Sequence, residues 1–242
     1  MTRRIRRARR NISGLTEWKS VLLTAPRPSV ALQRMVDTGK IHDYPGLAAL
    51  IDVPQDPHHH PEGDAWEHTK LVLDAAASLR ASVPKQHRLA YMLAALLHDI
   101  GKGKEGVVVR QEHVDAGLFP SKRLFTAYGH DKAGEAAARH FMQGIDVDQP
   151  TIDLALALIT THMQPYSMVG ASKKSFAKLA KKLEAKGANL RLLAALVRAD
   201  KGGRGQELSE EDEAPILKVL EWAAILEKET EKPKAPPPLI QG

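Results

Sequence analysis

The stretch of sequence that decides the fold is Ala90-Tyr-Met-Leu-Ala-Ala-Leu-Leu-His98-Asp99-Ile-Gly-Lys102-Gly-Lys104. Its apolar residues recur at helical spacing and nearly encircle the segment, so they predict a helix buried on most sides that ends at Gly101. An imidazole and a carboxylate stand side by side in the last turn of this helix. Because an unpaired buried carboxylate costs several kcal/mol, Asp99 requires a cation, either a basic side chain or a metal ion.

Helical periodicity also appears on both sides of this segment. It predicts helices over residues 65–81, 131–142, from about 150 onward, 172–186, 189–200 and 213–228, with short helices over 11–51. Asp64 and Asp131 are expected to cap the helices that follow them, and His140 and Leu217 to face inwards. The glycine-rich segment 101–129 is expected to be irregular, with at most a short strand over 107–109. The fold class is therefore all-α.

A chain of 242 residues with 43% hydrophobic content can bury a sizeable core. We expect an N-terminal helical segment, residues 13–52, packed on a main domain over residues 53–228. Residues 229–242 are rich in proline and charge and are predicted to be a disordered tail. The connector 53–64 contains His58, His59 and His60. It is predicted to be a solvated loop, although it leads into a helix and could form the rim of a site.

The formal net charge of +6 is misleading, because the first ten residues contain six arginines and no acid. The rest of the chain is neutral. The basic tail, residues 1–12, could contact nucleic acid or another polyanion; the alternatives are a disordered terminus or a wrongly chosen start codon. No apolar run follows the arginines, so neither a secretory signal nor a membrane span is expected. The absence of cysteine excludes disulfides and thiolate metal sites, and it fits a cytoplasmic protein.

Ligand-type residues stand at the ends of apolar stripes on five predicted helices. They are His68, His98, Asp99, His130, His162 and Asp200. For any one of them alone, a hydrogen bond or a pairing with lysine or arginine is a sufficient explanation. However, helices that bury their stripes must converge, and this brings the six side chains together around a cation. His140 has a similar placement, but a hydrogen bond within the core explains it.

Several segments of the chain match a known family. They are Val53-Pro-Gln-Asp-Pro, His60-Pro-Glu-Gly-Asp-Ala-Trp-Glu-His68-Thr, Leu97-His-Asp-Ile-Gly-Lys102-Gly, Tyr128-Gly-His130-Asp and Arg198-Ala-Asp200. Their order resembles the HD superfamily of metal-dependent phosphohydrolases, and more closely the C-terminal HD portion of bacterial CCA-adding tRNA nucleotidyltransferases. The resemblance covers roughly residues 15–205. The glycine and carboxylate motifs of the nucleotidyltransferase head do not occur, so CCA addition is not expected.

The resemblance implies an HD-domain helical bundle with short N-terminal helices. It further implies that His68, His98, Asp99 and Asp200 hold one divalent metal ion. His130 and His162 match the histidines that some members use for a second ion, with Asp99 bridging the two. Mixed imidazole and carboxylate ligands suit Mn, Fe, Co, Ni or Zn better than Mg or Ca.

Three further residues near these ligands are candidates for the chemistry. Lys102 and Arg204 lie on glycine-rich segments just beyond a ligand and could hold a substrate phosphate, although exposed basic residues in such loops are often only solvated. Asp131 could orient water or His130, although helix capping alone would account for it.

These features predict metal-assisted hydrolysis of a phosphoester. The resemblance suggests a phosphorylated small molecule or an RNA terminus as the substrate, such as a 2′,3′-cyclic phosphate. A phosphatase acting on (deoxy)nucleoside phosphates is a second enzymatic reading. The non-enzymatic alternative is an RNA- or nucleotide-binding module that uses the arginine-rich tail, but the intact set of ligand residues argues against a vestigial site.

Overall fold

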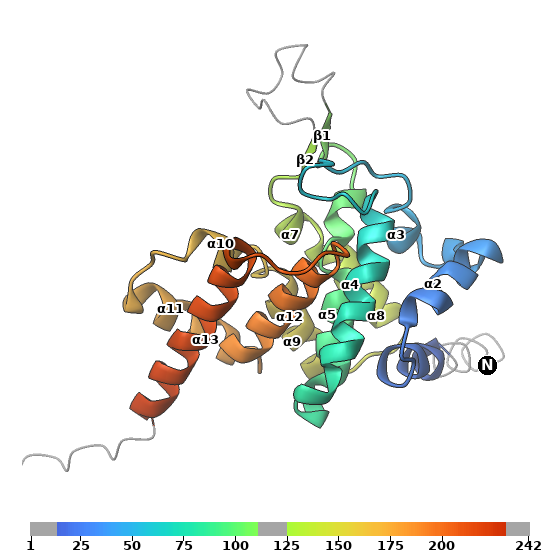
Figure 1. The fold of residues 1–242 in the computed structure, drawn as a ribbon. Coiled ribbons are helices and arrows are strands. Elements are labelled where there is room, and N and C mark those ends of the chain that lie inside the picture. Colours follow the sequence, from blue (N-terminus) through green and yellow to red (C-terminus); the bar gives the residue numbers. More distant parts are fainter. Residues whose placement is uncertain (1–13, 111–124, 231–242) are drawn as a thin grey trace, which may run out of the picture.

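The computed structural model describes residues 14–110 and 125–230, and in this part of the chain the fold is all-α, as predicted (Figure 1). Its only strands among these residues are β1 (Val109–Arg110) and β2 (Phe125–Thr126), which pair antiparallel. The predicted short strand therefore forms two residues later than expected. The predictions for the basic tail and for residues 231–242 lie outside the described residues.

Helices make up the rest of the regular structure. The chain is helical over residues 14–23. The elements that follow, in chain order, are α2 (Pro28–Asp37), η1 (Lys40–Asp43), α3 (Pro45–Ala48), α4 (Ala65–Leu79), η2 (Arg80–Ser82), η3 (Lys85–His87), α5 (Arg88–Leu97), η4 (Ile100–Gly103), α7 (His130–Ala133), α8 (Glu135–Gly144), α9 (Gln149–Ile159), α10 (Gln164–Ser167), α11 (Lys173–Glu184), α12 (Leu190–Gly202) and α13 (Glu210–Thr230). Here η denotes a 3-10 helix.

Helix α5 is the centre of the bundle, which confirms the prediction from its sequence. Every residue from Ala90 to Leu97 is buried, because α4, α9 and α12 pack around this helix and α13 covers α12 (Figure 1). The N-terminal segment is held to the bundle by aromatic packing. The ring of Trp18, which is fully buried, lies edge-on to Tyr44 and Phe141 at centroid distances of 5.2 and 5.1 Å.

Two helix ends differ from the sequence-based expectations. Helix α5 ends at Leu97 rather than continuing to Gly101, and the chain tightens into η4 after His98 and Asp99. The segment predicted as one helix from Asp131 is broken into α7 and α8 at Gly134. Asp131 does not cap it, because the cap position is Gly129, whose φ of 73° is left-handed, and no side chain caps the helix there.

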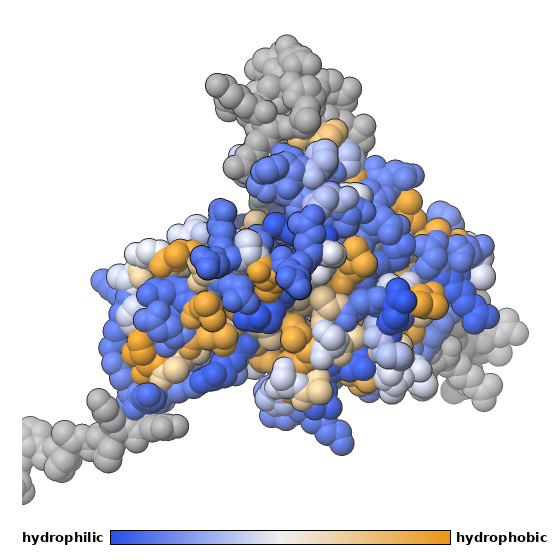
Figure 2. Space-filling model, in the orientation of Figure 1, coloured by the Kyte–Doolittle hydropathy of each residue, from blue (hydrophilic) through white to orange (hydrophobic). Residues whose placement is uncertain are grey.

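Two side chains expected to face inwards are exposed. His140 lies on the outer side of α8, since the buried residues of that helix are Ala138, Phe141 and Met142. Leu217 is 53% exposed because the buried side of α13 runs through Ile216 and Val219 instead. The outer faces of the helices in Figure 2 are mainly hydrophilic, with separate apolar patches. Among the described residues, none of the helices is both long and apolar enough to cross a membrane.

The break between α7 and α8 follows from a close contact with η4. A Cβ added at Gly101 would lie 2.0 Å from the carbonyl oxygen of His130 and 2.6 Å from the nitrogen of Gly134. We therefore expect Gly101→Ala to lower the free energy of unfolding by about 2 kcal/mol, because backbone atoms cannot yield as a flexible side chain does. The control is Gly144→Ala, since an added Cβ there meets nothing within 4 Å. Urea unfolding of both variants measures the difference, and equal stabilities would contradict the packing argument.

Candidate metal centre

The structure brings the six ligand-type residues together at one end of the bundle. His68 lies in the first turn of α4, and His98 and Asp99 follow the end of α5. His130 begins α7, His162 lies in the turn after α9, and Asp200 is in the last turn of α12. The four histidines and Asp99 are buried, and the side chain of Asp200 is 13% exposed.

The ligand atoms form two adjacent groups, His68, His98 and Asp200 in one and Asp99, His130 and His162 in the other. In the first group, Asp200 Oδ1 lies 3.0 Å from His68 Nε2 and 3.7 Å from His98 Nε2. In the second, His130 Nε2 lies 3.0 Å from Asp99 Oδ1 and 3.3 Å from His162 Nε2. Donor atoms bound to one ion at about 2.1 Å are separated by roughly 3.0–3.4 Å. Three of these four spacings lie in that range, and the spacing from Asp200 to His98 is slightly wider.

Asp99 joins the two groups. Its Oδ1 belongs to the second group, while its Oδ2 lies 3.3 Å from His98 Nε2 and 3.9 Å from His68 Nε2 in the first. The Asp99 carboxylate thus turns one oxygen toward each group.

In all four histidines, the Nδ1 atom has a partner that fixes the orientation of the ring. The acceptors are the Glu62 carboxylate at 2.6 Å from His68, and the carbonyl oxygens of Ala95, Ala127 and Ile159 at 2.9, 2.7 and 2.7 Å from His98, His130 and His162. Because each Nδ1–H donates outward, each Nε2 faces the interior of the site. Once Nε2 has lost its proton, the ring is in the tautomer that metal-binding histidines require.

Two atoms at the centre also support the fit of a metal ion. Within the described chain, His98 Nε2 and Asp99 Oδ2 are buried and make no hydrogen bond. Asp99 Oδ2 lies 2.7 Å from Lys102 Nζ, which gives an ion pair by distance without hydrogen-bond geometry. A buried polar atom without a partner is costly, and a divalent cation would satisfy both atoms.

The two carboxylates remain charged despite their burial. Burial alone would raise the pKa of Asp99, but the charges of Lys102, His98 and His130 hold it well below its usual range. Burial would also raise the pKa of Asp200. The hydrogen bond with His68 and the charges of the neighbouring histidines outweigh this effect and hold the pKa well below its usual range. The site is therefore a pair of anionic groups that attracts cations.

Glu62 belongs to the site, but it is not among the residues that the sequence predicted. Its carboxylate is buried and lies 2.6 Å from His68 Nδ1 and 2.9 Å from His60 Nδ1. Burial raises its pKa, but the hydrogen bonds from His60 and His68 outweigh this effect and lower it to about 2. The signal was present in the segment from His60 to His68, which matches the family.

Tyr166 was also missed. Its hydroxyl donates to Asp200 Oδ2 at 2.9 Å, so it fixes the second oxygen of the carboxylate whose first oxygen faces His68. Tyr166 lies on the four-residue helix α10, which is too short to show a periodic pattern.

A cavity of about 400 Å³ opens beside the centre. Of the predicted site residues, the ones that line it are Asp99, Lys102, His130, His162, Asp200 and Arg204. Asp131 is not among the lining residues, and the ring of His130 is oriented by Ala127 rather than by Asp131.

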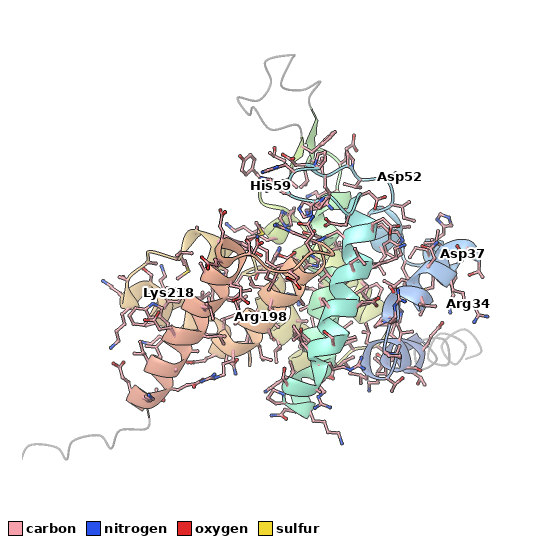
Figure 3. All side chains as sticks on the ribbon, in the orientation of Figure 1. Arg34, Asp37, Asp52, His59, Arg198 and Lys218 are labelled. Atoms are coloured by element: carbon pink, nitrogen blue, oxygen red, sulfur yellow. The ribbon has the colours of Figure 1, made fainter. Side chains whose placement is uncertain are left out.

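The histidine tract contributes to the rim of this cavity, which is the possibility that its place before a helix had left open, while His58 is exposed. His59 and His60 line the cavity, and His60 packs edge-on against His68 at a centroid distance of 4.7 Å. Figure 3 labels His59.

The three basic residues at the cavity are each paired with a neighbour. Lys102 Nζ contacts Asp99 and donates to Gln55 Oε1 at 2.6 Å. Lys201 and Arg204 approach Asp212 Oδ1 at 2.6 and 3.4 Å. They therefore stand at fixed places around the cavity with hydrogen-bond donors available for an anion.

Comparison with known proteins identifies the family of the chain. The model of the HD domain matches residues 65–221, so the chain belongs to the HD domain family. It is 36% identical over 122 residues to the multifunctional CCA protein of Halorhodospira halophila, covering 50% of this chain and 25% of that protein. It is 28% identical over 211 residues to the multifunctional CCA protein of Neisseria meningitidis serogroup B, covering 86% of this chain and 45% of that protein. The chain thus spans less than half the length of these relatives.

The protonation of His68 predicts how metal binding depends on pH. Burial lowers the pKa of His68, but its hydrogen bonds with Asp200 and Glu62 raise it to about 9 in the metal-free protein. A metal ion must displace that proton, so we expect the apparent affinity for Mn²⁺ to rise about tenfold per pH unit up to about pH 9. Competition with a chelator of known affinity between pH 6 and 8.5 measures this slope. An affinity independent of pH would contradict the assignment of His68.

The same shift affects the stability of the metal-free protein with the opposite sign. A raised pKa stabilises the folded state fully below about pH 6.5, the pKa of an unperturbed histidine. This contribution is lost as the pH rises through about 9.

Proposed function

We propose that this protein is a metal-dependent phosphohydrolase that cleaves a phosphoester of a nucleotide or of an RNA end, such as a 2′,3′-cyclic phosphate. The observation that carries the proposal is the pair of donor groups that share Asp99 beside a cavity with basic residues. Membership of the HD domain family supports the general class of metal-dependent phosphohydrolases. The likeness to CCA proteins supports a nucleotide or RNA end as the substrate.

The metal would be held by the residues already described. His68, His98, Asp200 and Asp99 would hold one ion, and His130 and His162 with Asp99 a second. Mn, Fe, Co, Ni and Zn suit this mixture of nitrogen and oxygen donors. A divalent ion bound there acts as a Lewis acid and lowers the pKa of water from 15.7 to about 7.

The side chains of the protein set the geometry for the reaction. Glu62 and the backbone carbonyls hold the imidazoles, and Tyr166 holds Asp200. Asp99 and Asp200 supply negative charge that repels an anionic substrate unless cations neutralise it. Lys102, Lys201 and Arg204 surround the cavity, so their charges can hold the phosphate against this repulsion.

The first experiment is metal analysis of the purified protein, followed by assays with Mn²⁺ and Ni²⁺. We expect about one or two bound ions per chain and hydrolysis of adenosine 2′,3′-cyclic phosphate and of an aryl phosphodiester. Turnover of deoxynucleoside monophosphates alone would instead assign the phosphatase reading. Absence of turnover with each metal, together with tight RNA binding, would contradict the enzyme and favour the binding module.

A further inference from the structure

The cavity beside the metal centre is lined by apolar as well as by basic side chains. The apolar lining residues include Val108, Phe125, Tyr128 and Met163. Tyr128 is 75% exposed and Met163 is 41% exposed. Of the five large hydrophobic side chains with high exposure in the described part of the chain, these two are at the cavity. Apolar and aromatic side chains that line a cavity together with a few polar groups are typical of a ligand site.

The position of Tyr128 is tied to the metal centre by a tight turn. Gly129 follows it in the left-handed region with φ of 73°, and His130 comes next. The carbonyl of Ala127 accepts hydrogen bonds from both the backbone nitrogen of His130, at 3.4 Å, and its ring Nδ1, at 2.7 Å. The Cα atoms of Tyr128 and His130 can be at most about 7 Å apart. When one group of a ligand is bound at the centre, an adjacent group of the same ligand can therefore contact Tyr128.

The chemistry of this cavity combines an anion site with a flat apolar contact. Lys201 and Arg204, both anchored by Asp212, offer positive charge to the cavity that Tyr128 and Met163 also line. Aromatic rings stack on nucleobases whatever their sequence, and a thioether adapts its shape to such a ring. A simple phosphate ester would leave the apolar part of the cavity without a contact.

We infer that Tyr128, supported by Met163, forms a stacking subsite for the base of a nucleotide whose phosphate lies at the metal centre. This inference rests on the proposed function and adds the residues that select a base-bearing substrate. A free nucleotide and the last nucleotide of an RNA share this chemistry. Tyr128 acts here as a binding residue, so its removal affects KM rather than kcat.

The test compares a substrate with a base and a substrate without one. Wild type, Tyr128→Ala, Tyr128→Phe and the control Leu217→Ala are assayed with Mn²⁺ on adenosine 2′,3′-cyclic phosphate and on glycerol 1,2-cyclic phosphate. Leu217 is also exposed but lies on α13 and does not line the cavity. We expect Tyr128→Ala to lower kcat/KM for the adenosine substrate about tenfold through KM, within the range for stacking of one base. The glycerol substrate should not respond, and Tyr128→Phe and Leu217→Ala should match wild type on both substrates.

An equal loss on both substrates, or no loss on either, would overturn the subsite. Failure of wild type to hydrolyse either substrate would contradict the proposed function instead. Calorimetry with AMP and with inorganic phosphate then tests the subsite. If Tyr128→Ala binds AMP more weakly than wild type but binds phosphate equally well, the subsite is supported. If AMP binding is unchanged, the subsite is overturned. Tighter binding of a trinucleotide than of AMP, lost in Tyr128→Ala, assigns the subsite to RNA ends, and equal binding assigns it to free nucleotides.

Discussion

Asp99→Asn is expected to reduce hydrolysis of a phosphodiester by at least about 10³-fold and to lower the metal content of the purified protein. The asparagine is nearly isosteric, but it lacks the charge that faces both donor groups through Oδ1 and Oδ2. Lewis-acid stabilisation of phosphoryl charge is worth several kcal/mol, and each 1.36 kcal/mol is tenfold in rate. Activity is measured with saturating Mn²⁺ and metal content by elemental analysis.

The matched control is Asp37→Asn. Asp37 is an exposed carboxylate on α2 that accepts from Gln33, and Figure 3 shows it on the outer side of the molecule. It should keep wild-type activity and metal content. If Asp99→Asn also kept wild-type activity and metal content, the only role of Asp99 would be its ion pair with Lys102. The assignment of the metal centre would then fail.

Removal of Glu62 is expected to weaken metal binding without removing a ligand. In Glu62→Ala, the ring of His68 loses the acceptor for its Nδ1 proton, so its Nε2 is no longer fixed as the acceptor that a metal requires. Loss of such a supporting carboxylate costs 10–100-fold in metal affinity, and we expect about 100-fold for Glu62→Ala and about tenfold for Glu62→Gln. The amide of glutamine can still accept through its oxygen, so its effect should be smaller.

Glu67→Gln is the control for the two Glu62 variants. Glu67 is in the same helix turn as His68 but points to solvent, where it pairs with Lys70 at 2.8 Å. Affinity for Mn²⁺ is measured by calorimetry, and melting temperatures show whether each variant is folded. Wild-type affinity in Glu62→Ala would show that the backbone, rather than Glu62, fixes the His68 ring.

The sequence predicted the meeting of the ligand residues because helix packing leaves little choice. An apolar stripe must face the core, so His68, His162 and Asp200 at the ends of stripes are carried to one place. The buried stretch before His98 determined the centre of the bundle for the same reason.

The residues that orient the ligands could not be predicted in this way. Glu62 lies in a loop, and Tyr166 on a helix of four residues, so neither has a periodic pattern that points to a partner. Helix boundaries failed where backbone contacts decide them. The close approach of Gly101 to His130 and Gly134 joins residues that are distant in the sequence. The inward prediction for His140 assumes one continuous helix, whereas the helix is interrupted at Gly134 and the buried face of α8 runs through Ala138, Phe141 and Met142.

The two donor groups differ in how many of their residues line the cavity. Asp99, His130 and His162 all do so, whereas in the other group Asp200 lines it and His68 and His98 do not. An ion held by the first group would have all three of its side-chain ligands at the cavity wall, and an ion held by the second only one. We therefore expect a chelator that enters the cavity to remove the first ion sooner than the second.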